Sequence, residues 1–222
     1  HRLERYSQVA LRAAEGQPDD HPECPGAATV GRVLEPLAFD ARVLGRDFAL
    51  LRPPPPEALW LGESALGGLM IDATDRDHLR RWHRSAPSFA HVVKMAARHA
   101  RDRLRHARGT QLRRGNALIA QSLASLHAGR VPLVLNTRAT ALHDGPSGIN
   151  GVTLIQDGCV RRVRARGGVI LATGGFNRHP LQRGARLPDI DIDWAAVSPG
   201  NLGMGLSLAE ACGAVYGTGA SS

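Results

Sequence analysis

The sequence predicts a mixed α/β fold with some α+β character, and three features carry this prediction. Residues 169–172 form a short apolar run closed by Thr173-Gly174-Gly175, which is typical of a strand buried on both faces of a parallel sheet. Residues 115–128 have the pattern of an amphipathic helix and residues 131–135 that of a buried strand, which together make half of a βαβ unit. Asp157-Gly158 between two strand-like runs predicts a β-hairpin that leaves the main sheet.

Along the N-terminal part, apolar residues at helical spacing predict a helix over residues 1–14. Residues 19–26 are rich in Pro, Gly and Asp, so we expect a surface loop there. The loop holds two Asp, His21 and Cys24, but it lacks the spacing of a metal site, and no metal is expected. Asp40 is expected to cap a short helix.

Two further helices are predicted, over residues 75–83 with Thr74 as N-cap and over residues 87–107. Pro87 suits the first turn of a helix, where its missing N–H costs nothing. The longer helix carries an apolar stripe that we expect to be buried, made of Phe89, Val92, Val93, Ala96, Ala97, Ala100 and Leu104.

The C-terminal half continues the pattern. The apolar face of the helix over residues 115–128 comprises Leu118, Ile119, Ser122, Leu123 and Leu126. Gly129 is its expected C-cap. Residues 149–156 and 159–166 are the two strands of the hairpin, and a last helix is predicted over residues 203–212.

The order of these segments resembles the flavoprotein family of succinate dehydrogenases and fumarate reductases, in particular the branch that includes the ketosteroid dehydrogenases. The resemblance covers residues 111–214 and is carried by Gly115-Asn116-Ala117-Leu118, residues 136–142, Ala172-Thr173-Gly174-Gly175-Phe176 and residues 200–206. It implies a partial FAD-binding Rossmann-like domain with a helical insertion and a β-hairpin excursion. It also implies FAD as cofactor and hydride transfer between a carbon–carbon bond and flavin N5.

The same resemblance implies which residues contact FAD. They are Ala139, Ala172, Thr173, Gly174, Asn201 and Gly203. In the last motif the Asp and Thr usual in the family are replaced by Met204 and Leu202, so two polar contacts are lost. The family's GxGxxG fingerprint and its catalytic residues lie outside the matched region, so the catalytic residues are unknown. We therefore expect a fragment that does not hold FAD tightly; a stand-alone reductase with a minimal site is the other possibility.

The resemblance implies two parts, a mostly helical, loop-rich substrate-side segment over residues 1–110 and part of the FAD-binding domain over residues 111–222. The implied partners are a small-molecule substrate, steroid-like or dicarboxylate, and the rest of the same polypeptide. No apolar run approaches the roughly 20 residues of a membrane span. The chain has no signal-peptide pattern and only three scattered cysteines, so we expect a cytoplasmic protein with reduced thiols.

The net charge of +8 offers an alternative function. Residues 76–114, called the basic segment below, hold twelve Arg or Lys against Asp77 and Asp102. Such a segment could make a non-catalytic module that binds nucleic acid. Aromatic residues for base stacking are not interleaved with the charges, so a solvated or docking helical face is the favoured interpretation.

Overall fold

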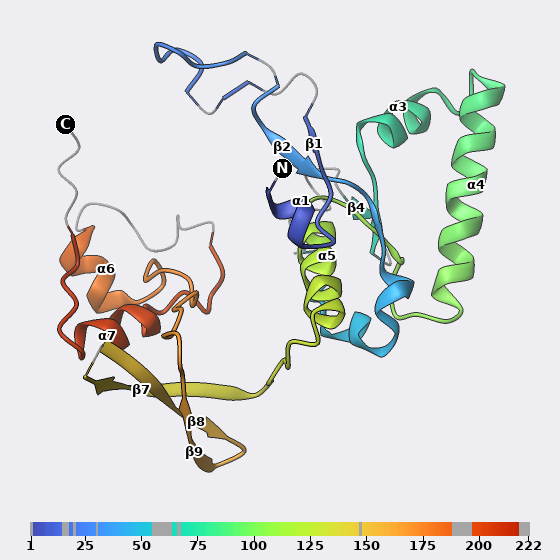
Figure 1. Cartoon of the computed structure of the whole chain (residues 1–222). Helices are drawn as coiled ribbons and strands as arrows, with labels where there is room; N and C mark the ends of the chain where they lie inside the picture. The colour runs from blue at the N-terminus through green and yellow to red at the C-terminus, as the bar shows by residue number, and fades with distance from the viewer. Residues whose placement is uncertain are drawn as a thin grey trace. The chain divides into compact units, whose positions relative to one another are not determined.

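The computed structural model describes residues 2–14, 18–19, 21–29, 31–54, 64–65, 68–146, 148–187 and 197–217. The chain forms two compact units, His1–Leu133 and Val134–Ser222 (Figure 1). Both units contain helices and strands, which confirms the predicted mixed content. Every strand pair among the described residues is antiparallel, so they do not by themselves form the parallel sheet of a Rossmann-like domain.

The first unit contains most of the helices. Its elements are α1 (Arg2–Tyr6), β1 (Leu11–Ala13), β2 (Leu34–Pro36), β3 (Phe39–Asp40), the 3-10 helix η1 (Ala41–Leu50), β4 (Ser64–Ala65), β5 (Leu69–Met70), α3 (Ala73–Arg81), α4 (Ala86–Arg103), β6 (Gln111–Leu112) and α5 (Arg114–Ala128). Strand β1 pairs with β2, β3 with β6, and β4 with β5. As predicted, Asp40 caps η1, because its side chain accepts a hydrogen bond from the Arg42 N–H at 3.1 Å.

The core of the first unit forms around α5. A single buried cluster joins α5 to η1, β5 and β6, and it comprises Ala41, Leu44, Phe48, Leu51, Met70, Leu112, Ala117, Ala120, Leu123 and Ala124. The predicted helix and its C-cap Gly129 are confirmed. The predicted buried face is wrong in part, since Ile119 is exposed. Small alanine side chains line the inner face instead, and they let the α5 backbone approach its neighbours closely.

The N-terminal helix is shorter than predicted, since α1 ends at Tyr6 and Leu11–Ala13 is a strand. Ser7 explains the ending. Its hydroxyl donates to the Leu3 carbonyl at 2.6 Å and accepts from the Val9 N–H at 3.2 Å, so backbone groups that would continue the helix bond to a side chain. The chain then turns into β1, which pairs with β2.

Helices α3 and α4 lie side by side (Figure 1), and they match the two predicted helices with different details. Helix α3 is capped by Asp72 rather than by Thr74. Asp72 and Asp75 form a capping box, each side chain accepting from the other residue's N–H at 2.8 and 3.1 Å. Pro87 lies in the first turn of α4, as predicted.

The predicted burial of the α4 stripe is wrong. Phe89, Val93 and Leu104 are exposed, and the buried residues are Ser88, Met95 and Asp102. Polar bonds select this face: Ser88 Oγ lies 3.0 Å from His78 Nδ1, and the Asp102 carboxylate accepts from the Thr110 hydroxyl at 2.7 Å. Hydrophobic periodicity does not include such hydrogen bonds, and it therefore predicted the wrong buried face of α4.

The second unit contains β7 (Thr137–Gly145), β8 (Gly148–Gln156), β9 (Cys159–Arg164), α6 (Pro180–Arg186) and α7 (Met204–Glu210). The three strands form an antiparallel sheet in the order β7-β8-β9. Asp157 and Gly158 join β8 to β9 with φ values of 50° and 79°, so the predicted hairpin is confirmed. The predicted last helix is α7, with Gly203 as its N-cap.

The two apolar runs predicted as buried strands, residues 131–135 and 169–172, are not strands. Val131, Leu133, Val134 and Leu135 are exposed, and Ile170 is 92% exposed. Neither run pairs with another strand among the described residues. An extended segment becomes a strand only when a neighbouring strand takes up its N–H and C=O groups in a ladder, and no strand among the described residues does so here.

Candidate functional site

The glycine-rich end of the second apolar run is open to solvent. Ala172, Thr173, Gly174 and Gly175 are exposed, whereas the next residue, Phe176, is buried. Gly174 has a φ of 79°, a conformation that favours glycine. No hydrogen bond involves the backbone amides of residues 172–174 within the described part of the chain. This segment therefore offers unpaired backbone groups that a ligand can approach closely.

A second glycine-rich segment lies directly against the first. The Gly203 N–H donates to the Gly175 carbonyl at 2.9 Å, and a Cβ added to Gly174 would lie only 2.5 Å from Asn201 Oδ1. A Cβ on Gly205 would lie 2.1 Å from Thr173 Oγ1. The structure thus brings together Thr173, Gly174, Asn201 and Gly203, four of the residues singled out from the sequence, and Ala172 directly precedes them.

Ala139 lies on β7, the strand against which α7 packs (Figure 1). It is half-buried and pairs with Leu154 of β8. The ladder is irregular between Ala139 and Ala141, where the register shifts. All six predicted cofactor residues therefore belong to the second unit.

Helix α6 supports this arrangement, and the sequence analysis did not single out its residues. Gln182 Nε2 donates to Ser207 Oγ at 2.9 Å, and Arg186 pairs with Glu210 at 2.5 Å, so α6 is tied to α7. The Arg186 guanidinium also lies over the rings of Phe176 and Tyr216, 5.5 and 4.9 Å from their centroids. Pro180 was the one sequence signal that could have predicted the start of α6, because proline often stands in the first turn of a helix.

The two departures from the family motif put apolar side chains beside the site. Leu202 and Met204 are both about half exposed, at 47% and 45%. They flank Gly203, where the resemblance implied polar contacts. Any ligand at this edge therefore meets backbone groups and apolar side chains, and the polar side chains are Thr173 and Asn201.

Several charges of the basic segment are committed to the fold of the first unit. Arg108 is buried, donates to the Leu51 carbonyl at 3.0 Å and to Asn116 Oδ1 at 2.9 Å, and lies over the Phe48 ring at 4.9 Å. Burial lowers the pKa of Arg108. Arg113 pairs with Asp72 and, at 3.1 Å, with Asp75. Only part of the basic segment is therefore available to a partner.

The loop over residues 19–26 makes ordinary surface ion pairs. Asp19 pairs with Arg32 at 2.8 Å, and His21 with Glu23 at 3.0 Å. In the part of the chain that the structure describes, no group of three or more His, Cys, Asp or Glu is arranged to hold a metal ion. No helix among the described residues is long and apolar enough to cross a membrane.

Comparison with known proteins decides the family. A family model described as "FAD binding domain" matches residues 24–220, most of the chain. The chain belongs to the FAD-binding domain family. Its resemblance to the ketosteroid-dehydrogenase branch is also confirmed, by relatives that align with nearly the whole chain.

Three relatives show how far this likeness extends. The chain is 30% identical over 217 residues to a 3-oxosteroid 1-dehydrogenase of Mycolicibacterium smegmatis, a match of 95% of this chain and 36% of the relative. It is 29% identical over 176 residues to a 4-oxocyclohex-2-ene-1-carboxylate 5-dehydrogenase of Sinomonas cyclohexanicum, covering 79% of this chain and 29% of the relative. A crystal structure of 3-ketosteroid delta1-dehydrogenase from Sterolibacterium denitrificans, in complex with 1,4-androstadiene-3,17-dione, superposes with a TM-score of 0.76 at 29% identity. That match covers 94% of this chain and 37% of that one, so the chain spans about a third of the length of these relatives.

Proposed function

We propose that this chain forms one wall of the FAD site of a dehydrogenase or reductase that acts on a carbon–carbon bond. One observation carries the proposal: in a member of the FAD-binding domain family, the open end at Thr173-Gly174 lies against Asn201 and Gly203. Both segments bring glycine backbone to the same edge, and the apolar side chains of Leu202 and Met204 lie beside it. A large planar cofactor needs such an edge, because it must approach the backbone closely.

The described residues fit FAD at this edge. The unpaired amides of residues 172–174 are exposed, and Thr173 and Asn201 add side-chain hydrogen-bonding groups. Gly203 is buried, and the lack of a side chain there lets the second segment pack closely on Phe176 and Gln182. Backbone groups near Ala139 are assigned to the adenine side. FAD, when bound, supplies the acceptor or donor of hydride at flavin N5. The role of the chain is to position the cofactor and to exclude water from one of its sides.

The apolar runs at residues 131–135 and 169–172 belong to the same proposal. We assign them as strands of a Rossmann-like sheet whose pairing partners lie outside the described residues, in the rest of the polypeptide. The relatives are nearly three times as long as their matched parts, which leaves ample chain for such partners. Residues 111–222 then form part of the FAD-binding domain, and residues 1–110 lie on the substrate side.

We propose a ring ketone, steroid-like in shape, as the substrate class. The names of the relatives from Mycolicibacterium and Sinomonas both describe a dehydrogenase that acts on a ring bearing an oxo group. A dicarboxylate has no comparable support among these relatives.

The experiment is an NMR titration of the isotope-labelled chain with FAD, which detects weak binding residue by residue. We expect shifts at Ala139, at residues 172–174, and at Asn201 and Gly203, with weak affinity. Shifts that are absent, or scattered over the first unit, would refute the FAD site.

Two glycine variants sharpen the experiment. Gly174→Ala places a methyl group 2.5 Å from Asn201 Oδ1 at a positive φ, and it should abolish the shifts. Gly184→Ala on α6 is the matched control, because its added Cβ meets nothing within 4 Å. Equal effects of the two variants would contradict the assignment of Gly174.

A further inference from the structure

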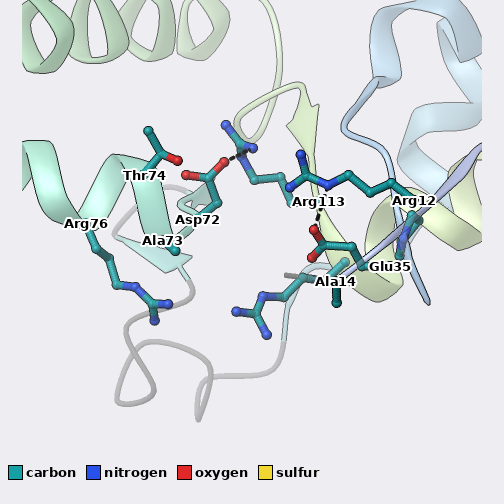
Figure 2. A pocket seen from close by; sticks show the side chains of 10 residues that line it. Arg12, Ala14, Glu35, Asp72, Ala73, Thr74, Arg76 and Arg113 are labelled. Atoms are coloured by element: carbon teal, nitrogen blue, oxygen red, sulfur yellow. Dashed lines mark hydrogen bonds and ion pairs between the residues drawn. The ribbon is translucent and has the colours of Figure 1, made fainter. Parts of the chain in front are cut away.

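A pocket of about 260 Å³ opens in the first unit, between β1, β2, the start of α3 and the junction of β6 with α5 (Figure 2). Its charged lining residues are Arg12, Glu35, Asp72, Arg76, Arg113 and Arg114. A water molecule occupies about 30 Å³ of liquid, so the pocket has room for a small ion with its hydration. None of the six residues proposed to contact FAD lines it.

Arginine side chains outnumber carboxylates among the described residues that line this pocket. There are four guanidinium groups and two carboxylates. Arg12 pairs with Glu35 at 2.7 Å, and Arg113 pairs with Asp72, as the dashed lines in Figure 2 show. Asp75 does not line the pocket but takes a second contact from Arg113 at 3.1 Å. The Arg76 side chain has no hydrogen-bond or ion-pair partner among the described residues, and it comes from α3, across the pocket from β1 and β2 (Figure 2).

Arg113 brings charge to the same pocket, although two carboxylates already bind it. Its Nη1 pairs with Asp72 and its Nη2 with Asp75, and its Nε is enclosed by protein. Each Nη carries two N–H groups, so one on each remains to donate to an anion.

Helix α5 begins at the same place. Arg113 is its N-cap residue and makes no side-chain cap hydrogen bond. The N–H groups of Gly115 and Asn116 make no backbone hydrogen bond within the described residues. The start of a 15-residue helix also carries a partial positive charge. A Cβ added to Gly115 would meet nothing within 4 Å, so this turn can be approached.

We infer that this pocket binds a small oxyanion, such as a phosphate or carboxylate group, between Arg76, Arg113 and the first turn of α5. Guanidinium groups hold such anions through paired, charge-assisted hydrogen bonds. Arg76 should contribute most to the binding free energy of the anion, because no carboxylate of the described chain neutralises it.

The test is an NMR titration with inorganic phosphate near pH 7, with sodium chloride keeping the ionic strength constant. We expect saturable shifts at the amides of Arg114, Gly115 and Asn116. Parallel titrations with acetate and citrate distinguish a phosphate site from a carboxylate site. Shifts that do not saturate, or that spread over the whole surface, overturn the proposal.

A matched pair of variants completes the test. Arg76→Ala should weaken phosphate binding by about tenfold or more, as expected for a charge-assisted contact. Arg80→Ala removes the same charge one turn further along α3, where the side chain is exposed and does not line the pocket, and it should change binding by less than about twofold. Equal losses in both variants would mean nonspecific attraction and overturn the site. Should Arg76→Ala fail to fold by circular dichroism, Arg76→Gln keeps the side-chain length and gives the same comparison.

Discussion

Replacing Leu112 with alanine tests whether the core around α5 holds the first unit together. Leu112 is fully buried on β6. The change removes the equivalent of three methylene groups, about 2.4 kcal/mol at about 0.8 kcal/mol each. Its neighbours in the cluster include Ala41, Ala117 and Ala120, whose short side chains cannot move into the space. The cavity therefore stays largely open, and we expect a total loss of about 3–4 kcal/mol, within the usual range for such changes.

Urea unfolding followed by far-ultraviolet circular dichroism measures this loss. With a slope of about 2 kcal/mol per molar urea, the midpoint should fall by about 1.5–2 M. Leu104→Ala is the control, because Leu104 is 85% exposed and its truncation should cost less than about 0.5 kcal/mol. A loss below about 1 kcal/mol for Leu112→Ala, or equal losses in the two variants, would show that the core lies elsewhere.

Three further predictions concern the site, the α3–α4 contact and the basic segment. Gly203→Ala should speed hydrogen exchange around Gly203, because φ is 68° there and the new methyl group would lie 2.9 Å from Phe176 Cβ; unchanged protection would contradict this. Burial alone raises the pKa of Asp75, but hydrogen bonds from His91 and from the Asp72 N–H, together with the charge of Arg113, lower it overall. The ionised carboxylate therefore stabilises the fold above the unfolded pKa of about 3.9. That stability is lost as the pH falls through the folded pKa. Asp75→Asn should therefore cost about 1–3 kcal/mol in urea unfolding near pH 7 and progressively less as the pH falls through the folded pKa, and a cost that does not fall with pH would be inconsistent with this linkage. The chain should not bind DNA or RNA in a mobility-shift assay, and binding that weakens steeply with salt would favour the nucleic-acid alternative instead.

Features set by a few neighbouring residues were predictable from the sequence. The Asp157-Gly158 turn needs two positive φ values, and this dipeptide is suited to both. Helix α5 and the cap at Asp40 depend on local propensity and on one side chain. The juxtaposition of Thr173-Gly174 with Asn201 could be anticipated only through the family resemblance, because Gly174 and Asn201 are 27 positions apart in the sequence.

Features that depend on distant partners were not predictable. Periodicity marked Phe89 and Val93 as buried, whereas the buried face of α4 follows its bonds to His78 and Thr110. The arginine pocket joins residues that are up to 102 positions apart, Arg12 and Arg114, and no short motif encodes it. A pattern of side-chain types describes one segment, and burial is a property of the segments around it.

The exposed apolar runs show what this dependence means for cofactor binding. Burying a Val, Leu or Ile side chain fully is worth about 1.5–3 kcal/mol, so covering Ile170 and the half-exposed residues at 131–135 is comparable with the net stability of a whole domain, about 5–15 kcal/mol. The run at 169–172 leads directly into Thr173 and Gly174. A strand that pairs with this run therefore orders the proposed FAD wall at the same time. Because the two events are linked, FAD that binds the ordered wall also favours the strand pairing. In a chain whose run is unpaired, the free-energy cost of ordering the wall reduces the observed affinity for FAD. Weak FAD binding by these residues alone is thus the expected consequence of the exposed apolar runs, even with every predicted contact residue present.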